Sequence, residues 1–126
     1  VGETFFDAVL LDYIKKENPA VNIKYAVRSK PIINDATYQD ALIAGIDRYA
    51  EIIESGVDAP GTVLSLCSKE FLSIFNSVDL IISKGQGNYE SLSQEKAPIF
   101  FLFMAKCPVI KNHLNCQLYD IILKRS

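Results

Sequence analysis

Apolar and polar residues along this chain repeat with the period of a helix in some segments and with the period of a strand in others. Residues 3–17 repeat apolar side chains at helical spacing, which predicts an amphipathic helix. Its apolar stripe consists of Phe6, Val9, Leu10, Tyr13 and Ile14. Residues 21–29 alternate apolar and polar side chains, which is typical of a strand. Further helices are expected at 36–46, 68–78, 88–94 and 107–115, and further strands at 48–55, 79–83, 98–105 and 117–124.

Helices and strands therefore alternate almost one for one. The segments 79–83 and 98–105 are continuously apolar, which predicts strands buried on both faces. Together these patterns predict an α/β fold with a largely parallel sheet, formed by residues 1–126 as a single domain.

Composition narrows the class of protein. With 126 residues, 49% of them hydrophobic and 22% charged, the chain fits one soluble globular domain. A net charge of −2 gives no support for a nucleic-acid partner or an anionic membrane surface. Apolar runs stay well short of the roughly 20 residues that span a bilayer. We therefore expect neither nucleic acid nor membrane as a partner.

Cysteine and histidine usage points away from several kinds of site. Cys67, Cys107 and Cys116 form no CxxC pair, which favours small buried thiols and, more weakly, a reducing, cytoplasmic setting. His113 is the one histidine, so neither a histidine-rich metal site nor a Ser-His-Asp or Cys-His set is indicated. We expect His113 on the surface or at a helix end.

The stretch "SKGQGNYE" lies where a predicted strand gives way to a helix, and ligands of open α/β sheets bind at such strand ends. Lys84 supplies a positive charge there, Gly85 and Gly87 free the backbone, and the amides at the helix start favour an anion. The spacing matches neither a Walker A loop nor GxGxxG. A plain strand-to-helix turn with a solvated lysine explains the same residues.

Acidic residues mark two further positions. Asp35 in "PIINDAT" is either an ordinary helix N-cap or a hard oxygen ligand for a cation, with Asn34 as a neighbouring ligand or turn former. Glu3 and Asp7 share one helix face, as dipole partners or as support for a metal or a water. Taken together, the three features contain the parts for metal-assisted hydrolysis of a phosphate ester.

Four segments, "GETFFD", "KPIINDAT", "DLIISKGQGNYESL" and "FFLFMAKC", occur in the order and spacing seen in the metal-dependent damage-control phosphatases. This family was formerly domain of unknown function number 89, and the chain resembles its prokaryotic-type branch over nearly its whole length. The resemblance implies a three-layer, Rossmann-like catalytic domain that uses a divalent metal (Mg²⁺, Mn²⁺, Co²⁺ or Ni²⁺) to hydrolyse phosphate esters of small metabolites.

The resemblance also implies roles for individual residues. Asp35 corresponds to a metal ligand and Lys84 to the phosphate-binding lysine, and we expect both to be catalytic. The phosphate and substrate are expected to contact the surrounding residues, which are Lys84, Gly85, Gly87, Asn88 and Glu3.

In the family an Asp-Asn metal-binding pair stands just before the "GE" that is Gly2-Glu3 here, and a helical region precedes it. Both would lie before Val1. We therefore expect a C-terminal fragment that lacks two of three metal ligands, is inactive or impaired, and self-associates through exposed apolar surface. The alternatives are a non-catalytic module that binds a phosphometabolite or nucleotide, and methyl transfer, for which no glycine-rich methyl-donor loop is present.

Overall fold

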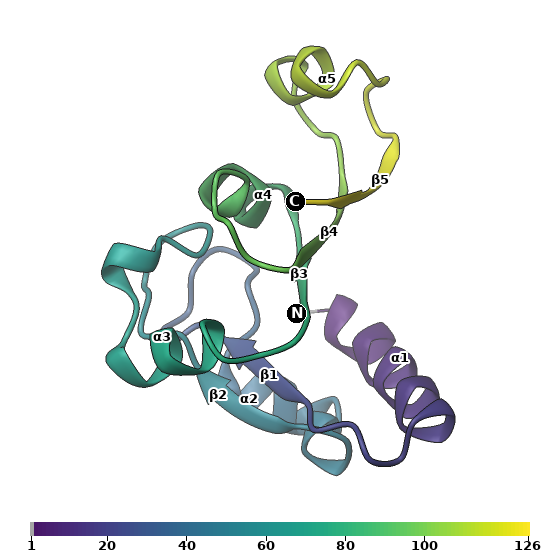
Figure 1. Ribbon diagram of the computed structural model, residues 1–126, viewed down its shortest axis with the longest axis vertical. Coiled ribbons are helices and arrows are strands. Elements are labelled where there is room, and N and C mark those ends of the chain that lie inside the picture. The colour runs from purple at the N-terminus through teal and green to yellow at the C-terminus, as the bar shows by residue number, and fades with distance from the viewer. Residues whose placement is uncertain (1) are drawn as a thin grey trace. The chain divides into compact units, whose positions relative to one another are not determined.

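The computed structural model describes residues 2–126, which form two compact units (Figure 1). The first unit comprises the described residues up to Asp58 together with Leu66–Phe71. The second comprises Ala59–Ser65 and Leu72–Ser126. Within residues 2–126, no helix has both the length and the apolar character that crossing a membrane requires.

The first unit packs helices against a pair of parallel strands. Its elements are α1 (Glu3–Glu17), β1 (Lys24–Val27), α2 (Tyr38–Ile43), the 3₁₀ turn η1 (Ile46–Arg48) and β2 (Glu51–Glu54). Strand β1 pairs with β2 in parallel, and Lys24 forms an ion pair with Glu51 opposite it. The core consists of Leu11, Val27, Ala41, Ile46 and Ala50. The predicted helix at 3–17 is confirmed over its full length.

Helix α1 turns an unexpected face to this core. An amphipathic helix usually packs its apolar stripe inward, yet Phe6 is 78% exposed and Val9 68% exposed. The buried side chains of α1 are Thr4, Asp7 and Leu11. Asp7 can be buried because Tyr25 on β1 donates its hydroxyl proton to Asp7 Oδ2 at 2.6 Å. The expected exposed apolar surface is therefore present, and self-association through it stays a prediction.

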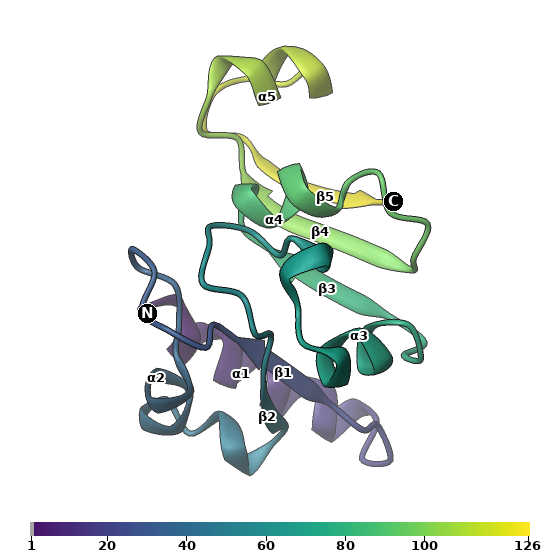
Figure 2. The ribbon, with the colours of Figure 1, turned by 90° about the vertical axis from the view of Figure 1, so that its left-hand side faces the viewer.

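The second unit contains a three-stranded sheet (Figure 2). Its elements are β3 (Ile81–Lys84), α4 (Gln86–Leu92), β4 (Ile99–Met104), α5 (Pro108–Leu114) and β5 (Ile121–Arg125). The elements η2 (Leu64–Leu66) and α3 (Lys69–Phe75) each include residues of both units. Strand β4 lies in the centre, parallel to β3 and antiparallel to β5. Parallel pairs in both units confirm the predicted α/β class, and among residues 2–126 only β5 pairs in the antiparallel direction.

Only one face of this sheet is well covered. Tyr89 of α4 stacks on Phe103 at 4.7 Å between ring centroids and meets Phe101 edge-on at 5.1 Å. On the opposite face Ile82 is 46% exposed and Leu123 73% exposed. The prediction of burial on both faces was wrong for β3, because α4 packs on the side of Phe101 and leaves Ile82 accessible.

Element ends shift from the predicted ones for identifiable reasons. Helix α4 begins at Gln86, two residues before the predicted start, because Gly85 makes the turn after β3 with φ +91°. Helix α2 begins after Thr37, whose hydroxyl accepts from the Asp40 amide while Asp40 Oδ2 accepts from the Thr37 amide.

The loop 59–63 of the second unit lies against α4 at very short range. Gly61 has φ +77°, and a Cβ built there would sit 2.5 Å from the Gly87 carbonyl oxygen and 3.0 Å from Ser91 Oγ. Gly87 in turn would place a Cβ 3.4 Å from the Gly61 amide nitrogen. Gly61 therefore permits a backbone approach that a side chain would prevent, whereas a Cβ at Gly87 would make an ordinary contact.

This contact predicts that Gly61→Ala destabilises the protein more than Gly45→Ala. Gly45 has nearly the same φ, +76°, but its nearest neighbours are side-chain atoms of Arg48 at 3.5 Å or more. Both substitutions carry the left-handed backbone penalty of about 1–2 kcal/mol. Only Gly61→Ala adds a clash, at a further cost of about 1–3 kcal/mol. Equal losses in urea unfolding monitored by circular dichroism would contradict the close approach.

A second prediction concerns Tyr25. Burial, followed by the hydrogen bond to Asp7, raises the pKa of Tyr25 well above its ordinary value of 10.0. The folded state thus keeps a proton that the unfolded state releases, so this contribution to stability is complete below about pH 10 and is lost as the pH rises further. Tyr25→Phe should lower stability at pH 7 by about 1–3 kcal/mol, because Asp7 loses its donor.

The deficit of Tyr25→Phe relative to the unmodified protein should shrink as the pH rises above 10, as measured by urea unfolding at a series of pH values. Tyr13→Phe, at an exposed position on α1, is the control and should show no such convergence. A Tyr25→Phe deficit that is constant with pH would refute the role assigned to this hydroxyl.

Candidate functional site

Asp35 lies in the loop that follows β1. Its amide donates to the Ile32 carbonyl at 2.9 Å, closing a tight turn. The carbonyl of the next residue, Ala36, accepts a hydrogen bond from the Arg28 amide at 3.0 Å, which joins the end of the loop to the end of β1. Thr37 is the N-cap of α2. Because Thr37 fills that role, helix capping does not account for Asp35.

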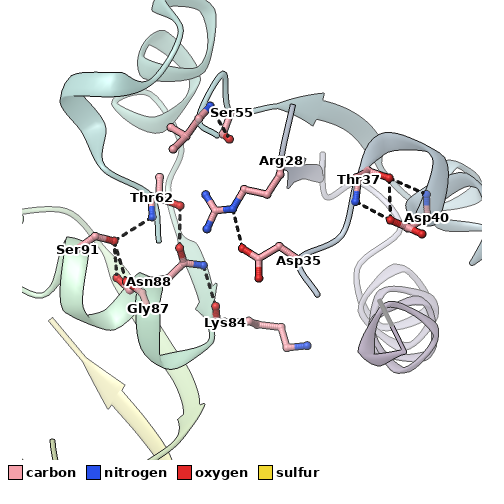
Figure 3. Close-up of polar contacts among 11 residues, drawn as sticks. Arg28, Asp35, Thr37, Asp40, Ser55, Thr62, Lys84, Gly87, Asn88 and Ser91 are labelled. Atoms are coloured by element: carbon pink, nitrogen blue, oxygen red, sulfur yellow. Dashed lines mark hydrogen bonds and ion pairs between the residues drawn. The ribbon is translucent and has the colours of Figure 1, made fainter. Parts of the chain in front are cut away.

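The partner of Asp35 is Arg28, which sequence reasoning missed. Arg28 Nε donates to Asp35 Oδ2 at 2.8 Å (Figure 3). The Arg28 side chain is only 8% exposed, whereas that of Asp35 is 44% exposed. A buried guanidinium needs an acceptor, so this pair fixes the direction of the carboxylate while leaving it open to solvent. The available signal was an arginine near the end of the strand predicted at 21–29.

In the loop after β1, the side chain of Asp35 is suited to bind a divalent cation. Carboxylate oxygens are ligands for Mg²⁺ and related ions, and Asp35 remains accessible although Arg28 engages its Oδ2. Across residues 2–126, however, no three His, Cys, Asp or Glu side chains are grouped so that they would hold a metal. Asp35 therefore fits as a single ligand, and the described residues do not complete a metal site.

Cys67 also belongs to the first unit, within reach of the charge of Arg28. Burial raises the pKa of the Cys67 thiol, and the positive charge of Arg28 opposes that shift only in part. The thiol is therefore protonated at neutral pH and poorly suited to act as a nucleophile. Glu3, the remaining predicted site residue of this unit, is exposed at the first turn of α1.

Lys84 is the last residue of β3, at the carboxyl end of a parallel strand pair. It lies opposite Leu102 of β4, and the amide that follows it, that of Gly85, donates to the Leu102 carbonyl at 3.0 Å. A Cβ on Gly85 would meet nothing within 4 Å, so this glycine is required for its backbone angle and not for space. The turn thus fixes where the lysine leaves the sheet.

Asn88 braces this turn from the first turn of α4. Its Nδ2 donates to the Lys84 carbonyl at 2.8 Å, and its Oδ1 accepts from the Thr62 hydroxyl at 2.8 Å (Figure 3). The amide of Thr62 also donates to Ser91 Oγ at 3.0 Å. Thr62 was absent from the predicted site because "VDAPGT" has the composition of an ordinary turn.

Gln86 ties the same turn to the end of β4. Its Oε1 accepts from the Lys106 amide at 2.7 Å, and its Nε2 donates to Glu90 Oε1 at 2.8 Å and to Cys107 Sγ at 3.4 Å. Cys107 in turn caps α5. The ends of two neighbouring parallel strands are therefore held together by one glutamine.

The predicted residues thus fall into two groups. Lys84, Gly85, Gly87 and Asn88 come together in one strand–turn–helix segment of the second unit. Asp35 and Glu3 belong to the first unit. Gly87, predicted to let a ligand approach, lies against the Gly61 loop of the chain itself.

Comparisons with known proteins agree with one another. A sequence model of the damage-control phosphatase ARMT1-like domain matches residues 1–122. An uncharacterised protein of Methanocaldococcus jannaschii is 45% identical over 98% of this chain, and proteins named damage-control phosphatase from Pyrococcus horikoshii and Archaeoglobus fulgidus are 44% and 36% identical over 100% and 98% of it.

Structural comparison gives the same family. The crystal structure of a DUF89 family protein from Pyrococcus horikoshii superposes with a TM-score of 0.93 and 40% identity, covering 99% of this chain and 44% of that one. The chain spans only 42–44% of the length of the curated relatives it matches. On the extent of the match, the chain belongs to the family of the damage-control phosphatase ARMT1-like domain.

Proposed function

We propose that the full-length protein is a metal-dependent phosphatase that hydrolyses phosphate esters of small metabolites. The match to the damage-control phosphatase domain over residues 1–122 is the observation that carries the proposal. Two relatives that are 44% and 36% identical are themselves named damage-control phosphatase. A reducing, cytoplasmic location remains a prediction from the cysteine content.

In this proposal Asp35 is a ligand of the divalent cation. A bound Mg²⁺, Mn²⁺, Co²⁺ or Ni²⁺ would supply Lewis-acid polarisation of a phosphoryl oxygen. The assignment is supported by the accessible carboxylate of Asp35, whose direction the ion pair with Arg28 fixes. It is also supported by the finding that Thr37, not Asp35, caps α2. Holding the carboxylate in place before a ligand arrives reduces the reorganisation that binding would require.

Lys84 is assigned to the phosphoryl oxygens. A cation at the carboxyl end of a parallel strand occupies the edge where ligands of α/β proteins bind. Its ammonium group would offset the negative charge that these oxygens carry in the transition state. Support comes from the backbone of Lys84, which is anchored on one side by β4 and on the other by Asn88.

The remaining predicted residues have supporting roles in this proposal. Gly85 gives the left-handed turn that directs the chain away from the sheet after Lys84. Gly87 and Asn88 stay assigned to phosphate and substrate contacts, although each also has a structural partner within the chain. Glu3 stays assigned to substrate contact at the start of α1.

The test is hydrolysis of p-nitrophenyl phosphate by the full-length protein with each of the four cations. Lys84→Ala should lower kcat/KM by about 10²–10³-fold, the usual effect of removing one group that stabilises transition-state charge. Asp35→Ala should abolish activation by metal. Lys111→Ala and Asp58→Ala, which remove exposed charges of the same signs, are the matched controls and should retain activity.

Full activity in Asp35→Ala would refute the metal assignment. Unchanged kcat/KM in Lys84→Ala would refute the phosphate assignment. Circular dichroism of each variant shows whether a loss of activity reflects the chemistry or the fold.

Phosphate binding without turnover is the second candidate, for these 126 residues by themselves. It is favoured by the observation that residues 2–126 contain no grouped set of three metal-binding side chains. Isothermal titration with inorganic phosphate should show binding to the 126-residue chain, and assays at matched concentration should show hydrolysis only by the full-length protein. Equal hydrolysis by both would contradict this candidate.

A further inference from the structure

The side chain of Asn88 is held at both ends by groups of the same chain. The Lys84 carbonyl is able only to accept, so the Asn88 atom that faces it is the donor Nδ2. The atom facing Thr62 is therefore the acceptor Oδ1, and the Thr62 hydroxyl must donate to it. The Lys84 carbonyl thus sets which way the Asn88 amide points, and the Thr62 hydroxyl anchors its Oδ1 end.

Thr62 is well placed to hold that orientation. The residue is only 9% exposed, so water would not readily replace its hydroxyl. Its own backbone is fixed against α4, because the Thr62 amide donates to Ser91 Oγ at 3.0 Å and Gly61 meets Gly87 without room for a Cβ. The donor is thus positioned before any ligand binds.

At the other end of the amide lies the last peptide of β3. On the β4 side the following amide, of Gly85, is bonded to the Leu102 carbonyl, and on the α4 side the Lys84 carbonyl is bonded to Asn88. Loss of the Asn88 bond would remove one of the anchors of this peptide. The position of the Lys84 side chain at the end of β3 would then be less well defined. Small misplacements of a group that positions a substrate lower the reaction rate considerably.

We propose that Thr62 is a positioning residue for Lys84: its hydroxyl anchors the Oδ1 end of the Asn88 amide, whose Nδ2 end holds the lysine backbone in the place required for binding phosphate. The proposal rests on the function proposed above, because it assumes that Lys84 binds a phosphate group. Thr62 itself touches neither the phosphate nor a metal in this scheme.

The experiment measures inhibition of p-nitrophenyl phosphate hydrolysis by inorganic phosphate in the full-length protein. Thr62→Val keeps the shape of the side chain and removes the hydroxyl, and it should raise the inhibition constant Ki of phosphate about tenfold. Thr62→Ser keeps the hydroxyl and should restore the original Ki. Thr62→Ala takes the place of Thr62→Val if the latter does not fold.

Ser91→Ala is the matched control. It removes the bond from the Thr62 amide and the bonds of Ser91 Oγ to the Gly87 and Asn88 carbonyls, but leaves the bond between the Thr62 hydroxyl and Asn88. It should lower the urea midpoint as Thr62→Val does and leave Ki unchanged. An equal rise in Ki for Ser91→Ala would mean that Thr62 acts through general loop docking, which would overturn the proposal.

A double-mutant cycle separates this proposal from the function on which it rests. If Thr62 acts through Lys84, Thr62→Val should add little to the Ki of Lys84→Ala, since effects that pass through one group are not additive. Full additivity would overturn the proposal. A rise in Ki for Lys84→Ala without a rise for Thr62→Val would contradict the role of Thr62 alone. An unchanged Ki for Lys84→Ala would contradict the assignment of Lys84 to phosphate binding.

Discussion

The amide of Asn88 is the constraint on which the arrangement of the second unit depends. It accepts from Thr62 and donates to the Lys84 carbonyl, and thereby joins a loop, a helix and the end of a strand. The glycines around it make this junction possible, Gly85 by its backbone angle and Gly61 by the absence of a side chain. The backbone of Lys84 at the strand end is therefore held by partly buried hydrogen bonds, which lose much of their value if one partner is removed.

Buried polar pairs have a similar role in the first unit. The pair of Asp7 and Tyr25 turns the polar side of α1 inward, and the pair of Arg28 and Asp35 directs a carboxylate outward from the end of β1. Buried ionised and hydroxyl groups require partners, so each pair restricts its element to one orientation. The apolar stripe of α1 is left exposed as a consequence, with Phe6 its most accessible member.

The sequence predicted the elements better than their surroundings. Periodicity located α1 at its observed ends, and the alternation of helix and strand predicted the α/β class. Periodicity identifies an apolar stripe but not what covers it, so the sequence predicted exposed apolar surface without locating it on α1. Residues such as Arg28 and Thr62 were missed because their importance arises from partners 7 and 26 positions away along the chain, which local patterns do not encode. The roles of Asp35 and Lys84 still stand as predictions.

The central claim is that Lys84 binds the phosphate group and Asp35 the metal, each held in place beforehand by its own neighbours. The most direct measurement is a crystal structure of the full-length protein with Mn²⁺ and inorganic phosphate, in which anomalous scattering locates the metal. The account predicts manganese bonded to the Asp35 carboxylate at about 2.1–2.2 Å, near the distances of other divalent cations, and a phosphate oxygen hydrogen-bonded to Lys84 Nζ. Manganese bound away from Asp35, or phosphate bound elsewhere with Lys84 Nζ in solvent, would contradict it.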